Sequence, residues 1–152
     1  MREILFKGKQ VRNGEWIEGS LLIFNDGYCI SQGSCGDLDD LCDIDFGYGF
    51  MEVDRETIGQ YTGLKDKNEK RIFDGDIIKF TNNVDEIFHE EVGVCVFESA
   101  DSGFCVQRMI KNPDNYPVPT TIHTIYLISN DEHEASYEII GNIHDNPELL
   151  ED

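Results

Sequence analysis

VDRETIGQYTGLKDKNEKRIFDGDIIKF, residues 53–80, is the stretch of sequence that decides the fold. Its β-prone segments, Thr57–Thr62 and Ile77–Phe80, are separated by polar turn residues at Lys65–Asn68 and Asp74-Gly75. Glycine allows a tight backbone and aspartate accepts hydrogen bonds from nearby amides, so both residue types favour turns. This alternation predicts short antiparallel strands joined by tight turns.

The same pattern extends towards the N-terminus. Asn13-Gly14 stands between two β-prone runs and is a strong hairpin signal, and Trp16 beyond it is predicted to be a core anchor. The pattern fails between Gln32 and Gly49, where glycine and aspartate dominate, so we expect a long loop or an extended arm. The acidic run Asp37–Asp45 lacks the central glycine and distal glutamate of an EF-hand loop, which favours a solvated acidic loop over a calcium site.

Beyond residue 80 the sequence predicts a polar break at 82–91 and then a hairpin formed by Val92–Phe97 and Phe104–Ile110. Gly93 is expected to mark a bulge or a close approach of two backbones. Three prolines between residues 111 and 121 argue against a regular inner strand there. The last predicted elements are strands at Thr121–Ile128 and Tyr137–Ile143 and one helical turn at Asn146–Leu150.

Together these elements predict a mostly-β chain. We expect a small antiparallel barrel or sandwich-like single domain over residues 1–152, with long loops or an extended arm and one short C-terminal helical turn. A chain of 152 residues with 39% hydrophobic and 11% aromatic residues is large enough to fold around a core without disulfides.

The location of the protein is predicted from what the sequence lacks. No apolar run approaches the roughly 20 residues that span a bilayer, and Met1–Gln10 has no signal-peptide core. The five cysteines are odd in number and form no C-x-x-C pair, which argues against a disulfide framework or a zinc ribbon. We therefore expect a soluble cytoplasmic protein with reduced thiols and no membrane contact.

The charge is large and uneven. The net charge is −19, from 31 acidic and 12 basic residues, which disfavours direct binding to a nucleic-acid backbone. Residues 26–54 carry eight acidic residues and no basic one, whereas residues 55–79 carry six basic and five acidic residues. This central segment either belongs to a solvated surface or meets an anion or acidic surface of another subunit.

No enzymatic mechanism assembles from the sequence. His89, His123, His133 and His144 are scattered, and no P-loop, dinucleotide fingerprint or nucleophile elbow is present. The carboxylates of Asp74 and Asp76 could bind a metal, but turn and strand-cap chemistry is favoured for them. The sequence predicts no catalytic residue, no metal and no cofactor.

Three segments carry a family resemblance: TIGQYTGLKDKN at 57–68, IFDGDII at 72–78 and IIGNIHDNPELL at 139–150. With the opening residues 5–19, they resemble the YopX family of phage and prophage proteins over nearly the whole chain. The chain departs from that family at Asp74, where glutamate is more usual, and at Glu69, where glycine usually follows the asparagine. The departure at Glu69 favours a wider loop over a type I′ turn.

The resemblance implies a mostly-β fold, a phage or prophage origin and oligomerisation, and it implies no established activity. The leading hypothesis is a non-catalytic accessory protein of the bacterial host cytoplasm that forms a homo-oligomer and binds a host or phage protein. Tyr61, Leu64, Ile72 and Phe73 would supply apolar area at the fold's centre or a subunit contact. The residues predicted to contact a partner or subunit are Arg55, Gln60, Tyr61, Lys65, Lys67, Lys70 and Arg71.

Two alternatives stay open. One is an anti-defence or host-takeover inhibitor. Such an inhibitor would either mimic nucleic acid, with the acidic side chains of Asp37–Asp45 and Asp131–Glu134 on one face, or sequester a nucleotide signal. The other is a metal-dependent hydrolase. Structural turn roles are predicted for Gly59, Gly63, Asp66, Gly75, Asp76, Gly141, Asn142, Asn146 and Pro147.

Overall fold

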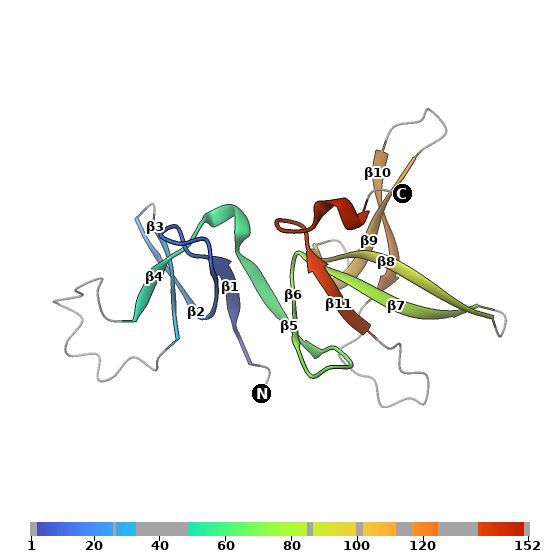
Figure 1. Cartoon of the computed structure of the whole chain (residues 1–152), viewed down its shortest axis with the longest axis horizontal. Helices are drawn as coiled ribbons and strands as arrows, with labels where there is room; N and C mark the ends of the chain where they lie inside the picture. Colours follow the sequence, from blue (N-terminus) through green and yellow to red (C-terminus); the bar gives the residue numbers. More distant parts are fainter. Residues whose placement is uncertain are drawn as a thin grey trace. The chain divides into compact units, whose positions relative to one another are not determined.

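The computed structural model describes residues 3–25, 27–32, 49–84, 87–99, 102–111, 117–124 and 137–150 (Figure 1). They form antiparallel strands and short 3-10 turns. The strands are β1 (Phe6–Lys9), β2 (Trp16–Phe24), β3 (Gly27–Ser31), β4 (Phe50–Glu52), β5 (Gly59–Lys65), β6 (Arg71–Phe73), β7 (Asp76–Val84), β8 (Ile87–Glu98), β9 (Gly103–Lys111), β10 (Pro117–Thr124) and β11 (Tyr137–Asn142), and the 3-10 turns are η2 (Arg55–Thr57) and η3 (Pro147–Leu150).

The chain divides into two compact units, Met1–Tyr61 and Thr62–Asp152. In the first unit the strands follow the order β4-β3-β2-β1-β5. An isolated bridge between Gln10 and Val53 also joins the end of β4 to the end of β1. The sheet therefore curls back on itself without closing into a barrel within the described residues.

The curled sheet encloses the core of the first unit. Ile17, Ile30 and Val53 are buried there, and half-buried apolar side chains from neighbouring strands pack against them. Trp16 is not part of this core, so its predicted role as a core anchor is wrong. Its ring instead lies beneath the ammonium groups of Lys7 and Lys9, 4.9 and 5.5 Å from the ring centre, an arrangement that favours partial exposure.

The hairpin predicted at Asn13-Gly14 is present. The backbone N–H of Gln10 donates to the carbonyl of Glu15 at 2.9 Å, and that of Gly14 donates to Gln10 at 2.8 Å. Gly14 has a φ of 72°, the left-handed region that glycine adopts at little cost. The connection is longer than a two-residue turn, since β1 ends at Lys9 and β2 begins at Trp16.

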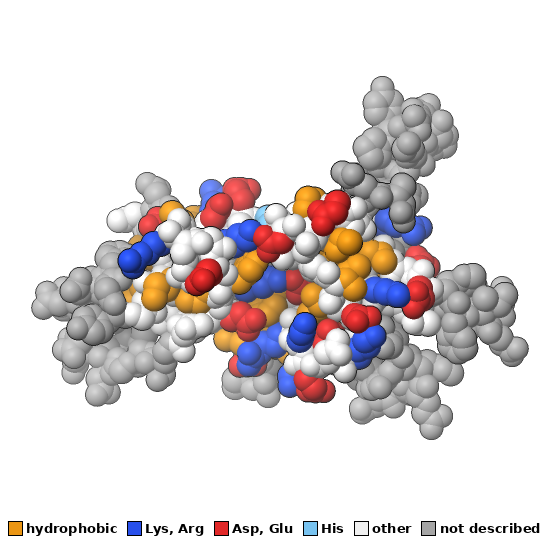
Figure 2. All heavy atoms as spheres, viewed as in Figure 1, with side chains coloured by type: hydrophobic (Ala, Val, Ile, Leu, Met, Phe, Trp, Pro, Cys, Tyr) orange, Lys and Arg blue, Asp and Glu red, His pale blue; other side chains and the backbone are white. Residues whose placement is uncertain are grey.

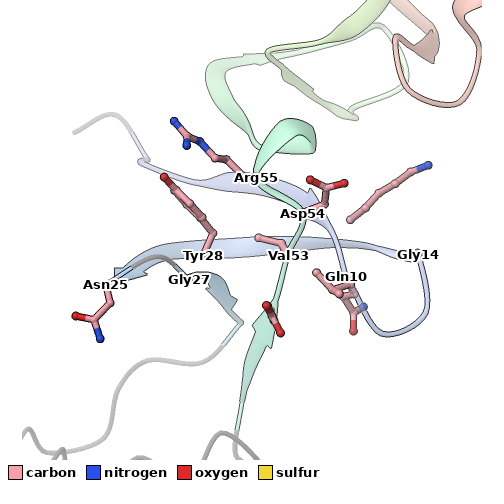
Figure 3. A pocket seen from close by; sticks show the side chains of 11 residues that line it. Gln10, Gly14, Asn25, Gly27, Tyr28, Val53, Asp54 and Arg55 are labelled. Atoms are coloured by element: carbon pink, nitrogen blue, oxygen red, sulfur yellow. The ribbon is translucent and has the colours of Figure 1, made fainter.

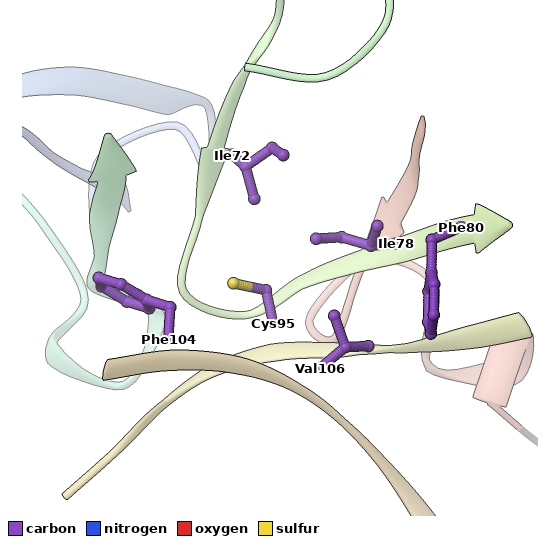
Figure 4. Close-up of a cluster of buried hydrophobic side chains, with 6 residues drawn as sticks. All are labelled: Ile72, Ile78, Phe80, Cys95, Phe104 and Val106. Carbon is purple, nitrogen blue, oxygen red and sulfur yellow. The ribbon is translucent and has the colours of Figure 1, made fainter. Parts of the chain in front are cut away.

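In the second unit, β6 follows β5 in its sheet, and a separate sheet has the order β10-β9-β8-β7-β11. The core of this unit is formed by Ile72, Ile78, Phe80, Cys95, Phe104 and Val106 (Figure 4). The alternation in β8 and β9 places Cys95 opposite Val106 and Phe97 opposite Phe104. Of the bulge and the close approach predicted for Gly93, the structure shows the close approach. A Cβ at this position would lie 2.6 Å from Val106 Cγ1.

The polar break predicted at 82–91 is wrong. β7 continues to Val84 and β8 begins at Ile87, with Asn82 opposite His89 in one continuous ladder. Backbone pairing between the two long strands overrides the low β propensity of asparagine. The proline-rich segment behaves as expected, because β10 contains Pro117 and Pro119 and is an edge strand rather than an inner one.

The mostly-β prediction is confirmed, with two antiparallel sheets and the short C-terminal turn η3. Most of the predicted loop at Gln32–Gly49 lies outside the described residues, as do residues 125–136, which hold the end of the strand predicted at Thr121–Ile128. Of the described residues, none belongs to a helix with the length and apolar character needed to cross a bilayer.

Candidate functional site

The loop that joins β5 to β6 gathers most of the predicted contact residues of the second unit. We define the basic loop as residues 65–71, in which Lys65, Lys67, Lys70 and Arg71 are all exposed. β5 ends at Lys65 and β6 begins at Arg71, so the connection is wider than a type I′ turn, as the glutamate at position 69 predicts.

Asp66 fixes the shape of the basic loop. Its Oδ1 accepts hydrogen bonds from the backbone N–H groups of Asn68 at 2.8 Å and Lys70 at 2.9 Å. Its Oδ2 accepts from the backbone N–H of Ile139 in β11 at 3.2 Å. The N–H of Lys67 also donates to the carbonyl of Tyr137 at 2.9 Å. The loop is therefore tied to β11 at two points rather than projecting freely.

The Asp66 side chain is buried, and its hydrogen bonds determine its charge. Burial raises the pKa of the carboxyl group, but bonds from Lys70, Ile139 and Asn68 to the ionised form outweigh burial, so the pKa lies below its ordinary value. The carboxylate is thus ionised at neutral pH, and its predicted role as a turn residue agrees with its contacts.

Two lysines of the basic loop, Lys65 and Lys67, already have acidic partners within the second unit. Lys65 Nζ lies 3.0 Å from Glu69 Oε2, and Lys67 Nζ lies 2.7 Å from Glu138 Oε2. Figure 2 likewise shows basic and acidic side chains interspersed on the visible face rather than segregated. Exposed ion pairs contribute only about 0–1 kcal/mol, so an acidic group of a partner could replace either carboxylate at small cost.

The other predicted contact residues lie in the first unit or in the core. Arg55 is exposed in η2, Gln60 is half-buried in β5, and Tyr61 is only 5% exposed. Ile72 and Phe73 are buried as well, at 0% and 1%. Of the two roles predicted for these apolar residues, the fold's centre is the one that burial supports. A subunit contact through Tyr61 stays a prediction.

The predicted turn residues other than Asp66 fall into two groups, one between β5 and β7 and one around the start of η3. In the first group, Gly59 and Gly63 lie within β5 rather than in a turn, although Gly63 has a left-handed φ of 93°. Gly75 has a φ of 86° and donates its N–H to Cys95, and the buried Asp76 accepts the Phe73 N–H at 2.8 Å. The second group packs together around the start of η3: Gly141, Asn142, Asn146 and Pro147.

Asn142 organises that second group. Its Oδ1 accepts the backbone N–H groups of His144 and Asp145, at 2.9 and 3.0 Å. A Cβ at Gly141 would lie 2.7 Å from Asn146 Oδ1, so only glycine fits against the turn that leads to Pro147. The family-like segment at 139–150 therefore has a structural explanation.

Metal binding has no cluster to support it in the described part of the chain, where no three histidine, cysteine or acidic side chains gather. The Asp76 carboxylate caps the turn before β7 through the Phe73 N–H, which is the turn chemistry favoured for the Asp74 and Asp76 pair. His144 is exposed, and the side chains of His89, His123 and His133 lie outside the described residues.

The first unit contains a cavity of about 660 Å³ (Figure 3). It lies where the end of β4 passes between the β1–β2 turn and the β2–β3 turn, next to the Gln10–Val53 bridge. The guanidinium of Arg55 lies 5.5 Å from the centre of the Tyr28 ring at this cavity. Glu52 and Asp54 also line it, so its charged lining has both signs.

Sequence reasoning found Arg55 but missed its neighbours at the cavity. The sequence does not single out Tyr28, Gln10 or Asn25, because none of them stands in a recognisable motif. Their proximity to Arg55 depends on long-range pairing: the Val53 N–H donates to the Tyr28 carbonyl at 2.8 Å, and the Asp54 N–H to Lys9 at 2.8 Å. No local periodicity carries that information.

Comparison with known proteins gives a family and a fold. The profile of a family described as "YopX protein" matches residues 5–151. A protein of Enterococcus faecalis solved by crystallography is 24% identical, with a TM-score of 0.52, and the alignment covers 99% of this chain and 100% of that one. At this identity the likeness shows a shared fold alone. A search of curated proteins finds no match.

Proposed function

Since the chain belongs to the YopX protein family, we propose that it is a non-catalytic accessory protein of phage or prophage origin that associates with itself and binds a protein partner in the bacterial cytoplasm. The observation that supports this proposal best is the basic loop. It is exposed, held in one conformation by Asp66, and rich in cations within a chain of net charge −19.

Preorganisation makes the basic loop suited to binding. A loop that is already fixed loses little conformational entropy on association, and Asp66 holds the backbone of Asn68 and Lys70 in place. The lysine side chains at 65 and 67 extend from this fixed backbone and remain about half exposed, at 50% and 47%. In the proposed complex, Lys65 and Lys67 exchange Glu69 and Glu138 for carboxylates of a partner.

Charge complementarity favours an acidic partner surface. Half of the chain's basic residues lie between positions 55 and 79, and acid is in excess elsewhere, so a second copy offers acidic surface to the loop. Such contacts act mainly on association rate and specificity, and they weaken as salt screens the charges. Self-association through the loop is therefore expected to fall with rising ionic strength.

Light scattering of the full chain tests the proposal. We expect a mass above that of one chain at low salt, and a lower mass at high salt or in the double variant Lys65→Glu/Lys67→Glu. Arg12→Glu is the control for charge reversal outside the loop, because it reverses one exposed charge in the first unit; the single variant Lys67→Glu is its match in net charge. A monomer at every salt and concentration would overturn self-association.

The absence of catalysis and the identity of a partner need their own experiments. Incubation of the full chain with a panel of metals, with and without a chelator, tests hydrolase activity. Metal-dependent turnover would overturn the non-catalytic part of the proposal.

Pull-down from host lysate compares the parent with the Lys65→Glu/Lys67→Glu variant. A host protein captured equally by both would contradict recognition through the basic loop.

A further inference from the structure

We propose that the cavity of the first unit binds a ligand through a carboxylate group, with Arg55 as the residue that holds the carboxylate. The proposal is independent of self-association through the basic loop. It rests on Arg55, Tyr28, Gln10 and Asn25, four polar side chains that line one cavity.

Arg55 is positioned but not neutralised. The ring of Tyr28 supports its guanidinium through a cation–π contact at 5.5 Å, and the two side chains lie next to each other in Figure 3. Although Glu52 and Asp54 line the same cavity, Arg55 has no ion pair among the described residues. A guanidinium presents a planar fork of N–H donors that matches the two oxygens of a carboxylate.

The neutral side chains of the cavity are also available for a ligand. Within the described residues, the side chains of Gln10 and Asn25 and the hydroxyl of Tyr28 make no hydrogen bond. This differs from the turns elsewhere in the chain, where the side chains of Asp66 and Asn142 are occupied by backbone N–H groups. The lining of the cavity thus includes amide donors and acceptors in addition to the guanidinium.

The acidic residues of the cavity limit the charge of the ligand. Arg55 and Lys9 provide two positive charges, while Glu52 and Asp54 provide two negative ones. A group with a single negative charge can pair with Arg55, whereas a phosphate monoester with a second charge meets repulsion from the nearby carboxylates. The lining therefore favours a carboxylate over a phosphate.

The size of the cavity leaves two sources for that carboxylate. A volume of about 660 Å³ lies within the range of about 300–1,000 Å³ that accommodates small organic ligands. It admits either an acidic side chain of a short peptide segment or a free organic acid. The recognition chemistry is the same for both, so the experiment includes one arm for each.

Nuclear magnetic resonance of the ¹⁵N-labelled full chain tests this site directly. The ligands to add are acetyl-Ala-Glu-Ala-amide, its glutamine counterpart acetyl-Ala-Gln-Ala-amide, butyrate and inorganic phosphate, each up to about 10 mM, ten times a Kd of about 1 mM. We expect the glutamate peptide or butyrate, each with a single negative charge, to shift the Arg55 Nε–H signal and the side-chain amide signals of Gln10 and Asn25. Whichever of the two binds more tightly identifies the source.

Variants separate recognition from a non-specific charge effect. Arg55→Lys keeps the charge but removes the planar fork, and we expect it to weaken binding at least about tenfold. Tyr28→Phe keeps the ring and should retain most of the binding, while Lys70→Gln in the other unit should retain all of it. No localised shift with either carboxylate, an equal shift with the glutamine peptide, stronger binding of phosphate, or unchanged binding by Arg55→Lys would each overturn the proposal.

Discussion

The carboxylate of Asp66 accepts a hydrogen bond from the backbone N–H of Ile139 at 3.2 Å, which connects the basic loop to β11. The same carboxylate also accepts two N–H groups of its own loop. One buried side chain therefore holds a local turn and a long-range contact together. Two of the three segments that carry the family resemblance meet at this point.

Replacing Asp66 by asparagine should destabilise the second unit. The amide has one acceptor oxygen instead of two, so its NH₂ group would face either the N–H of Ile139 or those of Asn68 and Lys70. Leaving a buried donor unsatisfied costs about 1–3 kcal/mol in the free energy of unfolding. Urea denaturation measures the difference. Glu69→Gln is the control, because its exposed carboxylate should contribute less than about 1 kcal/mol.

Asp66 should also make stability depend on pH at the acidic end. Its pKa is lowered in the folded chain, so the stability it contributes is present above the unfolded pKa of about 3.9 and is lost as pH falls through the folded pKa. Urea midpoints of the parent and Asp66→Asn chains should converge as the carboxyl group becomes protonated. A constant difference between the two chains from pH 7 to pH 2 would contradict this assignment.

Replacing Glu69 by glycine should stabilise the chain. Glu69 has a φ of 64°, a left-handed conformation that costs about 1–2 kcal/mol for a residue with a Cβ and little for glycine. The added flexibility of glycine in the unfolded chain and the lost ion pair with Lys65 offset part of the gain, which leaves about 0.5–1 kcal/mol. Thermal unfolding of Glu69→Gly and Glu69→Ala separates the backbone effect from the ion pair. Equal melting temperatures for the two variants would show that backbone strain is not relieved.

The resemblance and the turn chemistry explain how much of this architecture could be predicted from sequence. The apolar run Ile77–Phe80 lies in β7, and the signals at Asn13-Gly14 and Pro147 mark a hairpin and η3. Each of these depends on neighbours in sequence. They were predictable because local backbone preferences and final structure agree there.

Features that depend on long-range pairing were not predictable. Asn82 and His89 are polar residues that pair with each other in the β7–β8 ladder. Their strand conformation follows from the register of the two strands and not from their own β propensity. The position of Arg55 on the Tyr28 ring follows from the pairing of the β4 end with β3. The contacts of the Trp16 ring with Lys7 and Lys9 likewise follow from the pairing of β1 with β2. These contacts join residues of different elements, so the sequence pattern alone does not predict them.

Replacing Gly93 by alanine should destabilise the core of the second unit. A Cβ at this position would lie 2.6 Å from Val106 Cγ1 and 2.7 Å from the carbonyl oxygen of Gln107. Because the second contact is with backbone, β8 and β9 would have to separate, at a cost of about 1–3 kcal/mol. Gly14→Ala is an informative comparison, since nothing lies within 4 Å of its Cβ position and only its left-handed φ resists the change. Urea denaturation should show that Gly93→Ala lowers the midpoint of the unfolding transition more than Gly14→Ala does.

Tyr137 should make stability depend on pH at the alkaline end. Burial, with a smaller contribution from Cys95, raises the pKa of its phenol to about 12, and its ring packs 6.4 Å from that of Phe80. The unfolded phenol ionises at about pH 10, so the stability held by the neutral phenol is present below pH 10 and is lost as pH rises towards the folded pKa. Absorbance titration should show one tyrosine ionising near pH 12 that is missing from Tyr137→Phe. The Tyr137→Phe chain should also lose less stability than the parent above pH 10, and parallel alkaline curves for the two chains would exclude Tyr137 as the cause.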